Sequence, residues 1–308
     1  MSLVIVTGIC GNLGKMVARR LHRDHEVLGL DRRPFLAKPK DITLYQIDIR
    51  RKKAEDIFRK HQGKITALVH LGIMHDPRMG DEEHHTFNVV GTTQLLEYCA
   101  RYSVPKVVVL SSANVYGPRP ENAQFLTEET PLMGSESFYA IRDLIAVDMI
   151  AQSFFWKQPE NETVILRPVH IVGSVNNAPS NYLRLKNPPT VLGFDPMVQL
   201  IHAEDVVEAI ALAVTPGARG VFNLAGPGGV PLSEVLRRLG RRPLPLPYPL
   251  FRQALRAMWR WGLTNFLAPE LDHIRYVCMV DGGRATRELG FSPKKSMDDT
   301  IQAALLRP

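Results

Sequence analysis

Three glycines near the beginning of the sequence have the spacing of a phosphate-binding turn. Gly8, Gly11 and Gly14 follow a β-branched run at residues 3–6, and a helical pattern of apolar residues comes after them. Gly8 allows a tight backbone turn, Gly11 leaves room for a pyrophosphate, and Gly14 lets the helix pack closely on the strand. The free N–H groups at the helix start would bind phosphate oxygens. This context predicts dinucleotide binding, although three glycines alone also fit an ordinary turn between a strand and a helix.

A carboxylate at the end of the next expected strand indicates which dinucleotide would bind. Residues 26–30 form an apolar β pattern that ends on Asp31. This is about 20 residues after the turn, where an acidic side chain can accept hydrogen bonds from the adenosine ribose. The same charge would repel a 2′-phosphate, whereas Arg32 and Arg33, which follow directly, could accept one. We predict that the cofactor is NAD.

Two further segments at strand ends could contact the same cofactor. Asp48 and Ile49 follow a strand expected at residues 42–47, and a carboxylate there can accept a hydrogen bond from an adenine amino group. Asp48 is equally suited to cap the basic helix that follows. A fourth strand expected at residues 67–71 leads into Leu71-Gly72-Ile73, a small-residue bend where a cofactor could lie against the backbone.

Strand and helix patterns alternate along most of the chain, which predicts an α/β fold around a parallel sheet. The fifth expected strand, residues 107–110, is apolar throughout, as is typical of a central parallel strand. It delivers Ser111 and Ser112 to the carboxyl edge of the sheet, where ligands bind in open α/β folds. The proline-rich segment 242–249 is expected to be an extended connector and not a helix. The other expected strands are 163–166, 199–202 and 221–224, and the expected helices are 86–102, 138–155, from 205, 251–261 and from 296.

Length, cysteines and charge bound the class of protein. At 308 residues the chain can form one large α/β domain, or one domain with a smaller lobe. Its three cysteines show neither a disulfide nor a metal spacing, so we expect a reducing, cytoplasmic location. No apolar run is long enough to span a bilayer, and a strand beginning at residue 3 argues against a secretory signal. The net charge of +7 accompanies no nucleic-acid motif, so we expect no nucleic-acid partner.

Four histidines and a set of regularly spaced arginines could each have either a structural or a functional role. His70, His75, His84 and His85 lack a metal-ligand spacing, so we expect no metal and interpret them as polar surface or loop residues. In the expected helix 251–261, arginines recur every four residues. This helix either caps a smaller lobe with its arginines in solvent, or attaches weakly to anionic lipid or an acidic partner. In neither case do we expect stable membrane insertion.

Several short motifs together make the chain similar to the extended short-chain dehydrogenase/reductase family, which includes nucleotide-sugar epimerases and dehydratases. In chain order they are TGICGNLG, HLGIM, NVVGT, SSANVYG, LRPVHIVG, IHAEDVVEAI, FNLAG and DGGRATRELGFSP. These motifs cover nearly the whole chain. The resemblance implies a Rossmann-type doubly wound parallel sheet in an NAD-binding domain at residues 1–175, with contributions from about 195–225. It also implies a smaller C-terminal substrate lobe formed mainly by residues 176–308.

The same resemblance, combined with the glycine turn and the strand ends, defines a set of cofactor-binding residues. The predicted cofactor-binding residues are Gly8, Cys10, Gly11, Asn12, Leu13, Gly14, Asp31, Arg32, Asp48, Ile49, Leu71, Gly72, Ile73, Asn88, Ser111, Tyr139, Pro168 and His170.

The resemblance also implies candidate catalytic residues, with one departure from the family pattern. In the family a serine polarises the substrate oxygen, a tyrosine transfers its proton, and a lysine four residues later lowers the tyrosine pKa. The matching positions are Ser112, Tyr139 and Asp143. A carboxylate there would raise the phenol pKa, and we expect Asp143 to lie near the surface of the cofactor cleft. Arg142 could replace the lysine, but only electrostatically. Tyr139 is therefore either catalytic or simply packed at a helix start.

Two further departures concern the substrate. Sugar-nucleotide epimerases of this family usually have an arginine four residues before the histidine that matches His202, and this chain has Val198 there. The asparagine common after the sixth strand is replaced by His170. Both changes disfavour a nucleotide-diphosphate sugar, although Arg184 or Arg275 could supply the missing charge.

Two functional hypotheses follow. In the first, the chain is an NAD-dependent oxidoreductase, epimerase or dehydratase that transfers a hydride at a carbinol carbon of a sugar or other small hydroxylated substrate. In the second, it binds NAD with little or no catalysis and acts as a regulator or subunit. We favour the enzyme, because Ser112 and Tyr139 are both present.

The resemblance implies a homodimer as well. Relatives commonly pair the helices expected here at residues 86–102 and 138–155 across a twofold axis. Candidate contacts, which core packing would also explain, are Leu95, Tyr98, Ile145 and Met149.

Overall fold

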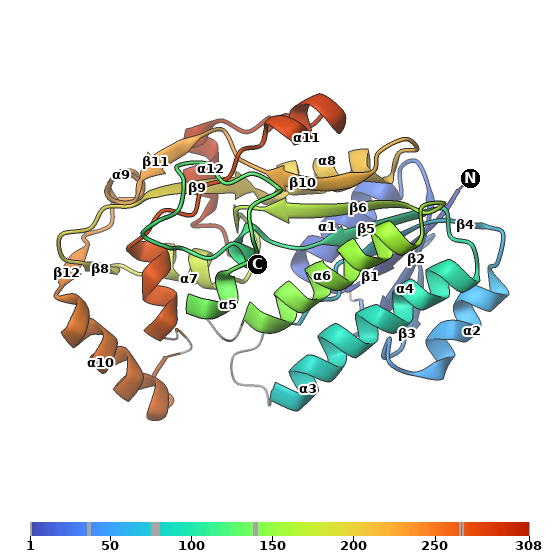
Figure 1. The fold of residues 1–308 in the computed structure, drawn as a ribbon, viewed down its shortest axis with the longest axis horizontal. Helices are drawn as coiled ribbons and strands as arrows, with labels where there is room; N and C mark the ends of the chain where they lie inside the picture. Colours follow the sequence, from blue (N-terminus) through green and yellow to red (C-terminus); the bar gives the residue numbers. More distant parts are fainter. Residues whose placement is uncertain are drawn as a thin grey trace.

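A parallel sheet forms the centre of the structure, a computed structural model that describes residues 2–35, 38–74, 81–137, 141–264, 266 and 268–307. Within these residues seven strands are joined in the order β10-β6-β5-β4-β1-β2-β3 (Figure 1). The strand order reverses between β1 and β4, which is the point where open α/β sheets bind ligands. The strands are β1 (Leu3–Thr7), β2 (Glu26–Asp31), β3 (Thr43–Gln46), β4 (Ile65–His70), β5 (Lys106–Leu110), β6 (Glu162–Pro168) and β10 (Gly220–Leu224).

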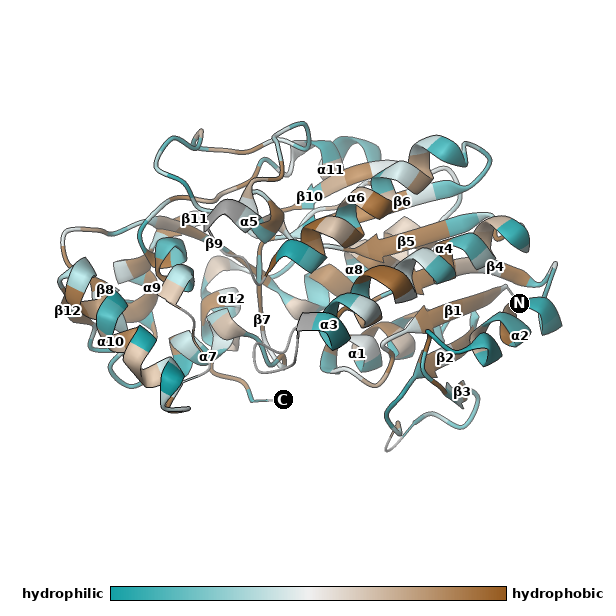
Figure 2. Cartoon of the chain, turned by 60° about the horizontal axis from the view of Figure 1, so that its bottom comes forward, coloured by the Kyte–Doolittle hydropathy of each residue, from teal (hydrophilic) through white to brown (hydrophobic). Residues whose placement is uncertain are grey.

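The strands are apolar on both faces because helices cover both faces. Successive side chains of a strand point to opposite sides, so Val4 and Val6 of β1 enter one core while Leu3 and Ile5 enter the other. Figure 2 shows this as hydrophobic strands under helices with hydrophilic outer surfaces. The first core is covered by α1 (Asn12–Leu21) and α8 (Ala203–Val214), and the second by α2 (Lys52–Lys60), α4 (Gly91–Arg101) and α6 (Arg142–Lys157).

A smaller lobe lies beyond the carboxyl edge of the sheet (Figure 1). Its own sheet has the order β11-β9-β7, and its core forms around Leu200, Val235 and Leu271. The chain leaves this lobe to build α8 and β10 and then returns to it. The lobe strands are β7 (His170–Val172), β8 (Pro189–Val191), β9 (Met197–His202), β11 (Gly229–Pro231) and β12 (Leu244–Leu246). Its helices are α7 (Ala178–Arg184), α9 (Leu232–Arg238), α10 (Tyr248–Arg260), the 3-10 helix η4 (Ala268–Ile274) and α12 (Met297–Ala303), whereas α11 (Gly283–Glu288) packs on β10.

The two long helices expected before and after β5 begin elsewhere. Before α4 come α3 (Asp81–His85) and a π-helical turn, η1 (Thr86–Val90). This wider turn places the buried Asn88 where its side-chain amide pairs with both backbone groups of Met74. The other helix, α6, begins at Arg142 and not at residue 138, after α5 (Gly134–Ser137). Residues 138–140 lie outside the described part of the chain.

The expectation that residues 242–249 contain no helix is wrong at their end. Residues 244–246 form β12, but α10 already begins at Tyr248, with Pro249 in its first turn. Proline is tolerated there because the first N–H groups of a helix have no intrahelical acceptor to lose. Similarly, α8 begins at Ala203 and not at residue 205, because the His202 side chain accepts the N–H of Glu204 and caps the helix.

A buried ion pair joins α6 to the main sheet. Asp148 of α6 and Arg167 of β6 have no appreciable exposure, and Nη2 and Nε of Arg167 donate to the carboxylate at 2.7 and 2.9 Å. Arg167 also donates to the hydroxyl of Tyr116, which in turn donates to Asn223 of β10. The Ser111 hydroxyl donates to Asp148 at 2.6 Å. The pair therefore fixes α6, β6, β10 and the segment after β5 relative to one another.

We predict that Asp148→Asn lowers the free energy of unfolding by about 3 kcal/mol, because the Arg167 charge stays buried without its counter-charge. Urea denaturation measures the change. The matched control is Asp298→Asn, which breaks an exposed pair with Arg238 and should change the free energy of unfolding by less than about 1 kcal/mol. Equal losses in the two variants would contradict a special contribution of the buried pair.

Candidate active site

A cleft of about 630 Å³ lies at the carboxyl ends of β1, β2 and β4, beside the start of α1. It brings together most of the residues that the sequence predicts for the cofactor, from four separate segments. The predicted residues that line it are Gly8, Cys10, Gly11, Asn12, Leu13, Gly14, Asp31, Arg32, Ile49, Leu71, Gly72 and Ile73. Lining residues that are not in the predicted set are Leu30, Arg33, Ile47, Met74, Phe87, Leu110, Ile171, Val175, Asn176 and Asn177.

At Gly8 and Gly14 the glycine turn leaves no space for a side chain. A Cβ atom on Gly14 would lie 2.2 Å from the carbonyl oxygen of Gly8, and one on Gly8 would lie 2.8 Å from the backbone of Gly72. Gly8 also has a φ of +69°, which other residues rarely adopt. Gly11 is the N-cap of α1, so the N–H groups of the first helical turn stand next to the cleft without intrahelical acceptors. The residues present therefore fit the pyrophosphate of a dinucleotide.

Asp31 is buried at the end of β2, and protein donors already occupy both of its oxygens. Oδ2 accepts the N–H of Cys10 at 2.9 Å, and Arg33 approaches both oxygens with Nε and Nη2 at 3.1 Å. Burial by itself raises the pKa of Asp31, but the hydrogen bonds from Arg33 and Cys10 outweigh it and lower the pKa below its usual value. The carboxylate is therefore ionised, with an arginine directly beside it.

Asp48 and Asn88 have contacts that the sequence pattern does not reveal, and neither lines the cleft. Asp48 accepts hydrogen bonds from the guanidinium of Arg50, at 2.6 Å from Nη2. The alternative role for Asp48 as a helix cap is wrong, because the N-cap of α2 is Arg51 and no side chain caps it. Asn88 is fully buried against the backbone that follows β4.

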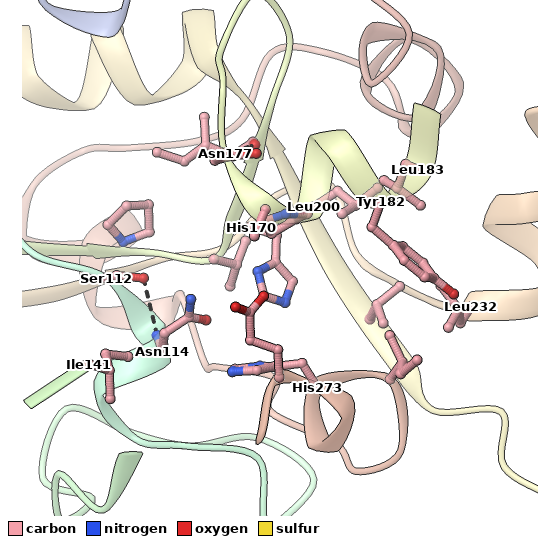
Figure 3. A pocket seen from close by; sticks show the side chains of 18 of the residues that line it. Ser112, Asn114, Ile141, His170, Asn177, Tyr182, Leu183, Leu200, Leu232 and His273 are labelled. Atoms are coloured by element: carbon pink, nitrogen blue, oxygen red, sulfur yellow. Dashed lines mark hydrogen bonds between the residues drawn. The ribbon is translucent and has the colours of Figure 1, made fainter. Parts of the chain in front are cut away.

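A second cavity of about 260 Å³ lies between the edge of the main sheet and the lobe (Figure 3). Four residues of the predicted set line it and not the cofactor cleft: Ser111, Ser112, Pro168 and His170. Ile171 and Asn177 line both spaces. The cleft and the cavity are therefore neighbours, and ligands in the two could approach each other across these residues.

Ser112 is the candidate catalytic residue that the structure places most clearly. It is the N-cap of the 3-10 helix η2 (Ala113–Val115), and its Oγ accepts the N–H of Asn114 at 3.2 Å (Figure 3). Because Oγ serves as the acceptor, its hydrogen can be donated to a ligand in the cavity. Ser111 differs, since its hydroxyl is committed to Asp148. Tyr139, the second candidate, lies outside the described residues.

The expected position of Asp143 near the surface is wrong. Its side chain is 7% exposed, in the first turn of α6, and its two oxygens contact Nδ1 of His85 at 2.9 Å and Nδ1 of His84 at 3.2 Å. Nε of Arg142 is 3.9 Å away, on a side chain that is about half exposed. The carboxylate thus joins the start of α6 to α3. Nothing in the local sequence indicates this contact, because the partners are almost sixty residues apart.

The interpretation of the histidines as polar surface or loop residues is wrong for His70 and His84, whereas His85 is exposed. His70 is buried in β4 between the hydroxyls of Thr7 and Thr92, and burial lowers its pKa to about 4. His84 is largely buried against Asp143, and His75 lies outside the described residues. In the part of the chain that the structure describes, no three His, Cys, Asp or Glu side chains are arranged to hold a metal ion.

Comparisons with known proteins agree with this geometry. Residues 4–225 match the NAD dependent epimerase/dehydratase family. An uncharacterized protein of Mycobacterium tuberculosis is 28% identical, with 99% of this chain and 85% of that protein covered. Among solved structures, UDP-glucose 4-epimerase of Thermotoga maritima superposes with a TM-score of 0.74 at 18% identity, covering 98% of this chain and 97% of that one. The NAD complex of dTDP-glucose 4,6-dehydratase from Bacillus anthracis has a TM-score of 0.73 at 18% identity, covering 99% and 96%.

This chain belongs to the NAD-dependent epimerase/dehydratase family. The family match confirms the sequence prediction of an extended short-chain dehydrogenase/reductase, and the superpositions confirm the Rossmann-type α/β fold. The protein is an NAD-dependent enzyme of the epimerase/dehydratase type, and its cofactor is NAD.

We predict that NAD binds at least about tenfold more tightly than NADP. The adenosine ribose of NAD can donate a hydrogen bond to Asp31, and a hydrogen bond to a charged group is worth about 1.5–3 kcal/mol. Asp31 would also repel the 2′-phosphate of NADP. In Asp31→Asn the two affinities should come within a few-fold of each other. Isothermal titration calorimetry with both cofactors measures this. Asp24→Asn, an exposed carboxylate paired with Arg20, is the control. Tighter binding of NADP to the unmodified protein would show that Arg32 and Arg33 set the choice.

We predict that Asp143→Lys destabilises the protein by about 3 kcal/mol, because an ammonium group would be buried beside two imidazoles with no partner. Restoring the family's lysine at this position should therefore not increase activity. Asp143→Asn keeps an acceptor for a histidine and should cost only about 1 kcal/mol. Urea denaturation compares both with Asp41→Lys, at a site 82% exposed. A fully stable and more active Asp143→Lys variant would contradict the structural role of the carboxylate.

Proposed function

We propose that the enzyme transfers a hydride between NAD and a carbinol carbon of a small hydroxylated substrate, such as a sugar. One observation carries the proposal: the dinucleotide cleft adjoins, at Ile171 and Asn177, a cavity that contains a serine hydroxyl able to donate. A substrate carbinol beside Ser112 would stand between that hydroxyl and the cofactor cleft. Nearness of this kind is the basic requirement for hydride transfer.

Each group of candidate residues has a separate role in the proposed reaction. Gly8, Gly11 and Gly14 would hold the pyrophosphate of NAD, and bound NAD supplies the hydride acceptor. The Ser112 hydroxyl donates a hydrogen bond to the substrate oxygen and holds it in place. We assign proton removal to Tyr139, on its position in the sequence four residues before Asp143.

Asp143 contributes to positioning in this scheme and does not lower a phenol pKa. Its contacts with His84 and His85 join α3 to the first turn of α6. A carboxylate in the first turn also interacts favourably with the helix dipole. Nε of Arg142 lies 3.9 Å from the Asp143 carboxylate, on a side chain that is about half exposed. We propose that Arg142 supplies any electrostatic help to Tyr139.

The hydride can return to the same substrate, as in an epimerase or dehydratase, or leave with released NADH. We propose that residues 1–175, with contributions from about 195–225, form the NAD-binding domain. Residues 176–308 would form mainly the substrate lobe. The crossing of the chain into α8 and β10 and back into the lobe supports this division.

We expect Ser112→Ala to slow reduction of bound NAD about 100-fold, as for loss of one donor to a reacting oxygen, and Tyr139→Phe to slow it about 100-fold or more. Single-turnover absorbance of the reduced nicotinamide measures both and detects a hydride that is later returned. Ser233→Ala and Tyr102→Phe are matched controls, because their hydroxyls bind Asp195 and Glu55 away from both cavities.

Unchanged turnover in Tyr139→Phe would rule out the tyrosine mechanism. NAD that copurifies with the protein but is never reduced, with any hydroxylated substrate offered, would favour the second hypothesis, a binding protein with little catalysis. Mass spectrometry of the purified protein identifies the cofactor and any small molecule that accompanies it.

We propose a cytoplasmic homodimer that uses the outer surfaces of α4 and α6. Three of the contacts suggested by the sequence do not serve here: Leu95, Tyr98 and Ile145 are buried in the chain's own core. Met149 remains exposed, and Trp156 lies two turns along the same helix with 77% of its surface exposed. Three free cysteines, two of them buried, suit a reducing compartment.

Light scattering at micromolar concentration should give twice the chain mass of 34.6 kDa. Trp156→Glu should shift the protein toward the monomer, because a charge would enter the centre of the interface. The control Trp261→Glu changes an equally exposed tryptophan at the end of α10. A monomer mass for the unmodified protein would contradict the proposed dimer.

A further inference from the structure

The charge of the second cavity indicates what kind of substrate it accepts. Its far wall is formed by apolar side chains such as Leu183, Leu200 and Leu232, opposite Ser112 and Asn114 (Figure 3). Val198, which stands where the family's epimerases usually have an arginine, is part of the same lining. Among the described residues that line the cavity there is neither a lysine nor an arginine.

The titratable groups of the cavity do not supply a positive charge either. Burial lowers the pKa of His170 to about 4, and burial together with the neighbouring His170 lowers the pKa of His273 to about 3. Their ring centroids are 5.8 Å apart, so protonating one would disfavour protonating the other. Both imidazoles are neutral at pH 7. The acidic residue of the lining, Glu270, adds no positive charge.

The two arginines that could have replaced the missing cation are used elsewhere. Arg184 donates to backbone carbonyls, including those of Val175 and Ala304, and so ties the end of the chain to α7. Arg275 is enclosed by aromatic rings, with its guanidinium carbon 4.2 Å from the ring centroid of Tyr248. Neither arginine lines the cavity. A diphosphate placed there would lose its hydration without gaining a counter-charge.

We propose that the substrate is an uncharged alcohol or ketone with an apolar body, and not a nucleoside-diphosphate sugar. This inference rests on the proposed function, because it assigns a substrate class to the same site. The apolar wall would bind the body by removing it from water, and Ser112 would bind the single reacting oxygen. Phosphate recognition is confined to the neighbouring cleft, at the start of α1.

Calorimetry on the NAD-saturated protein tests the proposal with neutral secondary alcohols, namely 2-butanol, 2-hexanol and 2-octanol, and with UDP-glucose. The dissociation constant should fall about fourfold for each added methylene, which corresponds to about 0.8 kcal/mol per buried CH₂. UDP-glucose should give no binding. No dependence on chain length, or UDP-glucose binding more tightly than 2-octanol, would overturn the proposal.

A pair of variants in the lobe sharpens the test. Val198→Arg places a cation in the cavity and should weaken 2-octanol binding about tenfold, whereas Leu192→Arg adds the same charge at an exposed site outside the lining and should not. Reduction of bound NAD is measured in parallel. Alcohols that bind without reducing NAD would defeat the proposed hydride transfer and leave the substrate class standing. UDP-glucose that binds and reduces NAD would do the reverse.

The surface of α10 has two apolar regions, one buried and one exposed. Phe251 and Leu255 point inward and cap the lobe core. A separate apolar stripe faces solvent and consists of Leu250, Met258, Trp261 and Leu263, the last two directly after the helix. Exposed arginines at positions 252, 256 and 260 form the adjacent face. The helix therefore caps the lobe and also presents an outer surface that is apolar and cationic.

We infer that this outer surface of α10 binds peripherally to anionic lipid. The arginine side chains complement the negative charge of the headgroups, while Trp261 and Leu250 reach the headgroup boundary. The attachment is peripheral, since no helix among the described residues combines the length and apolarity needed to cross a bilayer. This inference does not depend on the substrate class.

Liposome flotation tests it, using phosphatidylcholine vesicles with and without phosphatidylglycerol at low and high salt. The protein should float only with the anionic vesicles at low salt. Replacing the three arginines by glutamine should abolish flotation, whereas replacing Lys52, Lys53 and Lys60 of α2 by glutamine should not. Equal flotation with neutral vesicles, or none in any condition, would overturn the inference.

Discussion

The buried ion pair between Asp148 and Arg167 is the interaction on which the arrangement of the site depends. Two full charges in a core are tolerated only when each is paired and hydrogen-bonded, and here the pair is completed by Ser111 and Tyr116. These two residues lie at the ends of the segment that carries Ser112. The segment that carries the candidate catalytic hydroxyl is therefore held by polar contacts to α6 and β6. Burial raises the pKa of Tyr116 to about 12, so this tyrosine stays protonated as part of the framework.

The two ligand spaces differ in the forces they offer, although they share part of their walls. The cofactor cleft has backbone N–H groups at the start of α1, and Asp31 with Arg33 at its rim, so it favours a charged, polar molecule. The neighbouring cavity has an apolar wall and neutral imidazoles. A family fold that places both spaces at one sheet edge can keep the first and change the second. The departures at Val198 and His170 lie in the part that changes.

Asp143 shows how a substituted position can acquire another role. In this chain the residue is a buried link from α6 to α3 through His84 and His85. Both histidines come directly before the π-helical turn η1, which also holds the backbone of Met74 through Asn88. The start of α6, α3 and the segment after β4 are thus connected by side-chain contacts. The absence of the family's lysine is compatible with an ordered site.

The sequence by itself determined the features that depend on neighbours along the chain. The apolar strands, the glycine turn and Asp31 at the end of β2 are local patterns, and each lies where the pattern places it. Boundaries that depend on more distant contacts differ from the predicted ones. Residues 86–90, for example, are expected from the sequence to begin an α-helix but form the π-helical turn η1.

Only the tertiary structure decided how the polar side chains are paired. Arg33 lies against Asp31, Arg184 and Arg275 are used outside the cavity, and Asp143 is buried. Most of these partners are far apart in sequence, and a side chain's burial and charge partners are set by which elements pack together, which no local pattern records.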